Sequence, residues 1–141
     1  MSTRSRIALR HLDGTFTSIY CHFDGYPEGV GRTLLNHWSS EAAVKALMDL
    51  GNLSILGEVI GEKHSFDTHT SDDRNDCRAY GRDRGERDTH ALRSMTKASL
   101  VELAEDYCAD YLYVFSGNEW HWQSLCGTSG RLRKLHSKSV G

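Results

Sequence analysis

The sequence predicts an α+β domain, with an antiparallel sheet built from an N-terminal and a C-terminal hairpin and about three helices packed on one face of it. Three observations predict this class. Strand-like alternation occurs towards both ends of the chain, helix-like spacing occurs between, and glycine-containing turns separate the segments. The length of 141 residues suits one domain with one hydrophobic core.

The first predicted element is a β-hairpin. Residues 6–10 alternate between polar and apolar side chains, and Asp13-Gly14 is typical of a tight turn because glycine adopts a positive φ without strain. The return strand, over residues 15–23, places its more apolar face in the core, and that face comprises Ile19, Cys21 and Phe23. Tyr20 and His22 are then left on the opposite face.

Two helices are predicted to follow. Pro27 suits the first position of a helix whose buried stripe comprises Val30, Leu34 and Trp38. Ser39 or Ser40 caps a second helix that continues to about Leu50, with an inner face comprising Ala43, Val44, Leu47 and Met48. A short buried piece comes next and comprises Leu53, Leu56, Val59 and Ile60.

A third helix and a second hairpin are predicted in the C-terminal half. Thr96 suits the cap of the helix, whose apolar stripe comprises Leu100, Leu103, Ala104 and Tyr107. Residues 110–115 and 120–125 then alternate as two strands joined by a short turn. The spacing puts Trp120 and Trp122 on one face, where they are either core or a contact surface for a partner.

Two segments are predicted to lie at the surface. Residues 62–91 are rich in charge and poor in apolar anchors, which is typical of a long excursion from a domain over residues 1–126. Residues 127–141 are predicted to be a polar, basic tail. The excursion contains metal-ligand residue types, namely His64, His69, Asp72, Asp73 and Asp76. Their spacing matches no established metal site, so we interpret them as a solvated loop and predict no metal ligand and no cofactor.

Composition argues against several classes of protein. The net charge of -2 lacks the basic balance of a nucleic-acid-binding protein, so direct nucleic-acid binding is not expected. There is no run of about 18 apolar residues and no signal-peptide pattern, so we expect neither a membrane span nor secretion. The four cysteines are scattered, which is typical of reduced thiols in a cytoplasmic protein.

A candidate site lies where the return strand of the first hairpin meets the first helix. Its side chains are Tyr20, His22, Asp24 and Tyr26. Backbone N–H groups at a helix start favour an anion, but Glu28 competes for the same position, and a purely structural turn is the favoured interpretation over a ligand or partner contact.

A second cluster, in residues 80–86, contains two arginines. Arg82 and Arg84 could clamp a phosphate or carboxylate, or they could pair with neighbouring acids such as Glu86. If they fold back towards Tyr20 and His22, the domain gains a cationic, aromatic-lined pocket for a nucleotide-like molecule.

The sequence contains no complete catalytic motif. Cys21 and His22 are adjacent, but neighbouring residues of a strand point to opposite faces, so they cannot act as nucleophile and base together. No serine lies in a G-x-S-x-G elbow. We therefore predict no catalytic residue.

Several segments together resemble a group of small proteins encoded by bacteriophages and prophages, most of them of unassigned function. These segments are SIYCHFDGYPEGVG at residues 18–31, Leu34-Leu35, LSILGE at 53–58, GEKH at 61–64 and YGRDRGE at 80–86. The resemblance covers about residues 5–88 and implies a viral accessory role inside the bacterial cell. It implies no catalytic residues.

Three hypotheses follow from the residues and the resemblance. In the first, the chain binds and inhibits a host defence component, as an anti-CRISPR protein that blocks a CRISPR effector, and its partner is a host protein or protein complex. In the alternative, the chain is a sponge for a nucleotide or another small molecule. In the third, it is a metal-dependent or thiol enzyme.

Overall fold

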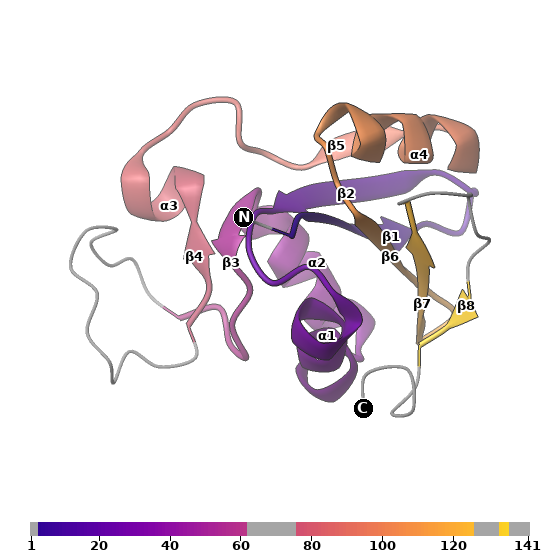
Figure 1. Cartoon of the computed structure of the whole chain (residues 1–141), viewed down its shortest axis with the longest axis horizontal. Coiled ribbons are helices and arrows are strands. Elements are labelled where there is room, and N and C mark those ends of the chain that lie inside the picture. Colours follow the sequence, from indigo (N-terminus) through magenta and orange to yellow (C-terminus); the bar gives the residue numbers. More distant parts are fainter. Residues whose placement is uncertain (1–2, 62–75, 126–132, 136–141) are drawn as a thin grey trace.

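The computed structural model describes residues 3–61, 76–125 and 133–135, and it confirms the α+β class (Figure 1). An eight-stranded sheet has the order β4-β3-β2-β1-β6-β7-β8, with β5 also paired to β2. The strands are β1 Ser5–Arg10, β2 Phe16–Cys21, β3 Leu53–Ile55, β4 Arg78–Ala79, β5 Leu92–Ser94, β6 Tyr111–Ser116, β7 Glu119–Ser124 and β8 Arg133–Lys134.

The sheet is mixed, so the prediction of a purely antiparallel sheet is wrong. The two predicted hairpins are present as β1–β2 and β6–β7, but β1 joins them by pairing parallel to β6. Strands β2 and β3 are parallel as well. Three helical elements lie between β2 and β3 in the chain, and such a crossover connection lets the second strand run in the same direction as the first.

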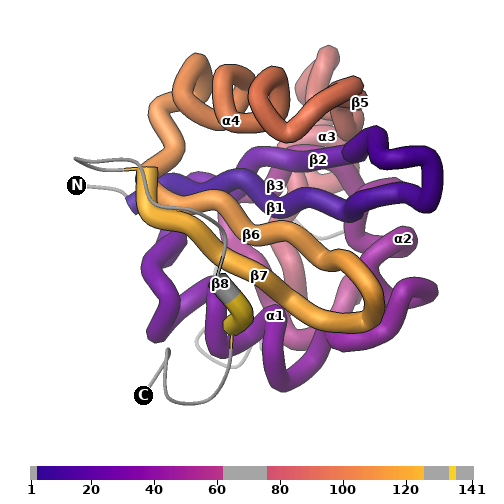
Figure 2. The backbone as a smooth tube through the Cα atoms, turned by 90° about the vertical axis from the view of Figure 1, so that its right-hand side faces the viewer, coloured from indigo at the N-terminus to yellow at the C-terminus, as the bar shows by residue number. Residues whose placement is uncertain are grey.

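One face of the sheet is covered by three consecutive helical elements, η1 Pro27–Gly31, α1 Arg32–His37 and α2 Glu41–Leu50 (Figures 1 and 2). Pro27 begins η1, which is a single wide turn, and Ser40 caps α2 by accepting a hydrogen bond from the backbone N–H of Ala43. The predicted stripes are buried against the sheet, in a core that includes Ile7, Ile19, Leu34, Trp38, Val44, Leu47 and Tyr113.

The opposite face is covered by α4, which spans Lys97–Asp106 (Figures 1 and 2). Thr96 begins this helix with a capping box that it forms with Ser99. A second core lies beneath it and comprises Ala8, Phe16, Leu100, Leu112 and Val114. The prediction of helices on one face is therefore wrong. Both faces of β1 are buried, so both need a cover.

Parts of the two predicted surface segments belong to the fold. Residues 76–91 contain β4 and a short helix, α3 Tyr80–Arg84, and Cys77 and Ala79 are completely buried. Within the predicted tail, β8 pairs with β7 and Leu135 is 2% exposed. Among the residues considered as metal ligands, His64, His69, Asp72 and Asp73 lie outside the described residues.

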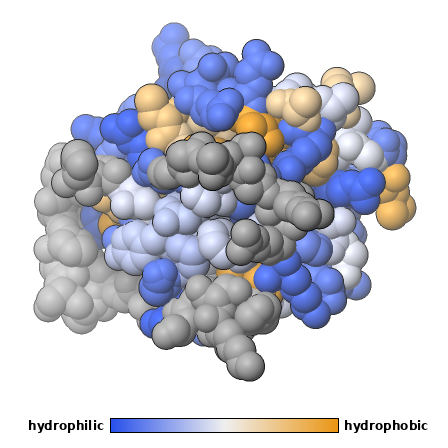
Figure 3. Space-filling model, turned by 45° about the vertical axis from the view of Figure 1, so that its right-hand side comes forward, coloured by the Kyte–Doolittle hydropathy of each residue, from blue (hydrophilic) through white to orange (hydrophobic). Residues whose placement is uncertain are grey.

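On the face shown in Figure 3, the coloured hydrophobic residues form small separate groups between hydrophilic ones. Each helix in the described part of the chain is too short or too polar to cross a lipid bilayer.

Candidate functional site

A cluster of basic and aromatic side chains lies on the α4 side of the sheet, at one end of β1 and β2. We call it the Arg–Tyr cluster, and it comprises Arg4, Arg6, Tyr20, His22 and Tyr107. The register pairs Arg6 with Tyr20 across β1 and β2. Extending that register by two residues brings Arg4 opposite His22, because alternate residues of a strand share a face.

Tyr20 and His22 share a face, as the alternation predicted. The Tyr20 hydroxyl lies 2.6 Å from His22 Nδ1. Burial raises the pKa of Tyr20 to about 12, although the charge of Arg4 opposes this shift. The pKa of His22 is lowered, mainly by burial and to a smaller extent by the charge of Arg4. At neutral pH the phenol therefore keeps its proton and the imidazole is neutral, and the imidazole tautomer decides which of the two donates.

Arg6 is buried at the centre of the cluster. Its Nε donates to Ser18 Oγ at 2.8 Å and its Nη2 donates to the Ser18 carbonyl at 3.2 Å. Its Cζ lies 4.7 Å from the centre of the Tyr107 ring. Burial lowers the pKa of Arg6 to about 10, with Tyr107 opposing the shift, so Arg6 remains a cation at neutral pH. Its Nη1 is buried and has no hydrogen-bond partner among the described residues.

Arg4 is the second cation of the cluster, and its Nε is also buried without a partner in the described part of the chain. The Asp110 carboxylate accepts a hydrogen bond from the Arg4 backbone N–H at 3.2 Å but forms no ion pair with its guanidinium. No ion pair joins Arg4 or Arg6 to any acid within residues 3–61, 76–125 and 133–135. Positive charge that is held away from water without an anion favours binding of one.

Gly25 helps to position Arg4. A Cβ at this residue would come within 2.8 Å of the Arg4 backbone, so only glycine allows the two segments to approach so closely. The Gly25 N–H donates to the Thr3 carbonyl, and its own carbonyl accepts a hydrogen bond from the buried Tyr113 hydroxyl. The Asp24-Gly25 turn of the SIYCHFDGYP motif therefore fixes the position of the backbone just before β1.

Aromatic rings extend the cluster to the surface, and we call the row Tyr107, Tyr20, His22 and Phe23 the aromatic strip. Its successive ring centres are 5.7, 5.9 and 4.5 Å apart. Tyr107 and Phe23 are 36% and 41% exposed. Phe23 was predicted to enter the core and does not, because β2 ends at Cys21 and the alternation stops there.

Asp24 and Tyr26 lie beyond the end of the strip. The Tyr26 hydroxyl donates to Asp24 Oδ1 at 3.0 Å, and both residues line a small pocket of about 150 Å³ that also includes Glu28. The helix start offers little to an anion, because its backbone N–H groups bond internally. Those of Gly29 and Gly31 donate to the Tyr26 carbonyl, and that of Val30 donates to the Asp24 carbonyl.

Arg82 does not act as the predicted clamp. Its Nε and Nη2 bind the Asp83 carboxylate, its Nη1 binds the carbonyls of Ile60 and Gly61, and its Nη2 also binds the carbonyl of Cys77. These bonds use all five N–H groups of the guanidinium, so none is left for a phosphate or carboxylate. Arg84 is exposed and pairs with Glu86 at 3.4 Å, which is the alternative that the sequence left open.

Both tryptophans of β7 pack against the core on the α1–α2 side of the sheet. Trp120 is 2% exposed, and its Nε1 donates to the Trp38 carbonyl at 2.8 Å. Trp122 is partly buried against the same core, and its Nε1 has no partner among the described residues. Trp120 is therefore a core residue and does not form a contact surface.

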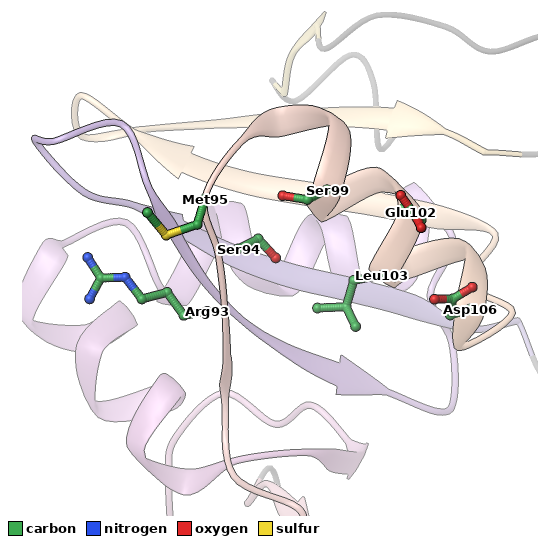
Figure 4. Close-up of a pocket in the computed structure, with 7 residues that line it drawn as sticks. All are labelled: Arg93, Ser94, Met95, Ser99, Glu102, Leu103 and Asp106. Carbon is green, nitrogen blue, oxygen red and sulfur yellow. The ribbon is translucent and has the colours of Figure 1, made fainter.

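A separate groove lies between β5 and α4 (Figure 4). Its volume is about 360 Å³, and its lining mixes Arg93 of β5 with Glu102 and Asp106 of α4. Arg93 already pairs with Asp13 at 3.2 Å. This groove contains no buried polar atom that lacks a partner, so the Arg–Tyr cluster is the stronger candidate.

Cys21 is not an available nucleophile, and the described residues show no metal centre. Cys21 is completely buried, and burial raises its pKa to about 12, so the thiol keeps its proton. No group of three histidine, cysteine or acidic side chains within the described ranges is placed to hold a metal ion.

Sequence reasoning missed three members of the cluster, namely Arg4, Arg6 and Tyr107. A signal for two of them was present, because Arg4 and Arg6 alternate with Ile7 and Leu9 and so share the face of Tyr20. Tyr107 was predicted as part of a buried helical stripe, whereas α4 ends at Asp106 and leaves Tyr107 as its half-exposed cap.

Comparison with known proteins adds no relative. No protein-family model matches the chain, and no curated protein or solved structure is significantly similar to it.

Proposed function

We propose that this chain is a phage or prophage accessory protein that acts in the cytoplasm of the bacterial host by binding and inhibiting a host defence component. In its specific form it is an anti-CRISPR protein, and its partner is a CRISPR effector complex. The resemblance in residues 5–88 supports the viral origin. The aromatic strip is the single observation that supports action by binding.

The strip has the properties of a protein contact surface. Tyrosine and arginine are enriched among the residues that contribute most to binding energy, and the strip places two tyrosines beside Arg6. Its rings already contact one another, so their side chains lose little freedom when a partner covers them. Phe23 and Tyr107 leave the largest exposed ring area within it.

Co-purification from bacteria that carry a CRISPR system tests this function, with phage plating efficiency on the same bacteria as the measure of inhibition. Phe23→Ser combined with Tyr107→Ser should weaken capture on the order of 30-fold, which corresponds to a combined loss of about 2 kcal/mol of binding free energy. The matched control is Leu12→Ser combined with Met95→Ser, which changes two hydrophobic residues outside the strip that are even more exposed than Phe23 and Tyr107. Unchanged capture and inhibition by the first double variant would refute the proposed contact surface.

A further inference from the structure

We propose that the Arg–Tyr cluster is also a binding site for a nucleotide-like ligand, whose phosphate contacts Arg4 and Arg6 and whose planar base stacks on the aromatic strip. The site shares Tyr20 and Tyr107 with the proposed contact surface, but it does not depend on a host partner. It differs from the pocket predicted from the sequence, because its cations come from β1 and the residue just before it, and not from residues 80–86.

The unused donors of the cluster carry the first part of this inference. Arg6 Nη1 and Arg4 Nε are buried N–H groups without partners among the described residues. Buried donors are nearly always hydrogen-bonded, so exceptions call for an acceptor. A phosphate supplies several anionic oxygens, and its hydrogen bonds to guanidinium groups are among the strongest in proteins.

The position of the two arginines carries the second part. Arg4 lies just before β1 and Arg6 is the second residue of that strand, so in extended chain their Cα atoms lie about 7 Å apart on one face. Long side chains at that separation can converge on a single phosphate. The backbone of Arg4 is fixed on two sides, because its carbonyl accepts hydrogen bonds from Asp110 and Tyr111 and its segment packs against Gly25.

Tyr107 controls access to the buried cation. Its ring covers Arg6, yet it is half-exposed at the C-terminal end of α4. Partly exposed rings change rotamer rapidly, so the proposal requires the Tyr107 side chain to turn away from Arg6 when a phosphate binds.

The exposed rings distinguish a nucleotide from a simple anion. Inorganic phosphate would use the arginines alone, whereas a nucleotide also covers the faces of Tyr107 and Phe23. Rings of this kind combined with cationic side chains are the usual means of binding a base and its phosphate together.

Isothermal titration calorimetry on the purified full chain tests the site. The probes are AMP, GMP, CMP and UMP, with adenosine and inorganic phosphate for comparison. We expect at least one mononucleotide to bind ten times more tightly than either comparison probe. Arg4→Gln and Tyr107→Ala should each weaken that binding at least tenfold. Arg10→Gln should leave it unchanged, because Arg10 lies on the same face at the exposed far end of β1.

The melting temperature of each variant shows whether it is folded. Arg6→Gln is interpreted only if it melts cooperatively, and Arg4→Gln decides the outcome if it does not. The proposal is overturned if no mononucleotide binds more tightly than phosphate, which would indicate an adventitious ion only, or if folded Arg4→Gln binds as the wild type does. These measurements contain no host protein, so their failure leaves partner binding intact, and lost host capture would not affect them.

Discussion

Arg82→Ala removes the side chain that joins the chain segments on either side of residues 62–75. Arg82 binds the carbonyls of Ile60 and Gly61 before that stretch and the carbonyl of Cys77 after it. It also holds the Asp83 carboxylate, which is completely buried and accepts the backbone N–H of Ala79 at 2.9 Å. Alanine would remove all five hydrogen bonds of Arg82 at once.

The size of the effect follows from the burial of the pair. Removing one partner of a buried ion pair costs about 3–5 kcal/mol, because the remaining charge loses its compensation. The Arg82 side chain is 17% exposed, so water can replace part of what is lost, and we expect the lower end of about 3 kcal/mol. For a domain of this size that loss lowers the melting temperature by roughly 10 °C.

Urea unfolding followed by circular dichroism measures the free energy of unfolding directly. Arg84→Ala is the matched control, since Arg84 is two residues away, 52% exposed and paired only at the surface with Glu86. Its loss should cost about 0–1 kcal/mol. If Arg82→Ala and Arg84→Ala lie within about 1 kcal/mol of each other, the assignment of Arg82 to a buried structural role is wrong.

Two further predictions concern side chains of the core and the cluster. Trp120→Phe should lower the free energy of unfolding by about 1–3 kcal/mol, because it leaves the buried Trp38 carbonyl without its donor. Trp122→Phe should lower it clearly less, because the Trp122 Nε1 has no hydrogen-bond partner among the described residues. Equal losses in urea unfolding would contradict this. Folding lowers the pKa of His22. As the pH falls below the unfolded value of about 6.5, the unfolded chain therefore binds a proton before the folded chain does. The free energy of unfolding declines with falling pH until the folded pKa is reached. His22→Gln should therefore lose less stability than the wild type between pH 7 and pH 5, and parallel pH profiles would rule the contribution out.

Local pattern predicted most of the fold. The alternation of residues 6–10, the Asp13-Gly14 turn and the Ser40 cap each depend on neighbours a few positions away, and all three are present. The parallel pairing of β1 with β6 could not be predicted in this way, because neither strand contains information about its distant partner. Elements of two to five residues such as β4, α3 and β5 are too short to show a period.

The candidate site was predictable in part for the same reason. Alternation alone places Tyr20 and His22 on one face, and extending the argument to β1 would have added Arg4 and Arg6. Charged residues on a strand normally indicate a solvent-exposed face, which hid the burial of Arg6. The role of Arg82 was not predictable, because it depends on backbone carbonyls that only the folded chain brings together.

The central position of β1 has a consequence for the order of events during synthesis (Figure 2). β1 leaves the ribosome before the segment that lies beside it, which is 106 residues further along the chain. At ordinary elongation rates that separation is roughly 5–20 s. Throughout this interval the nascent β1–β2 hairpin has an unpaired strand edge on β1, and such an edge is a template for pairing with another chain. The time at which β6 is synthesised therefore limits when the sheet of this domain can be completed.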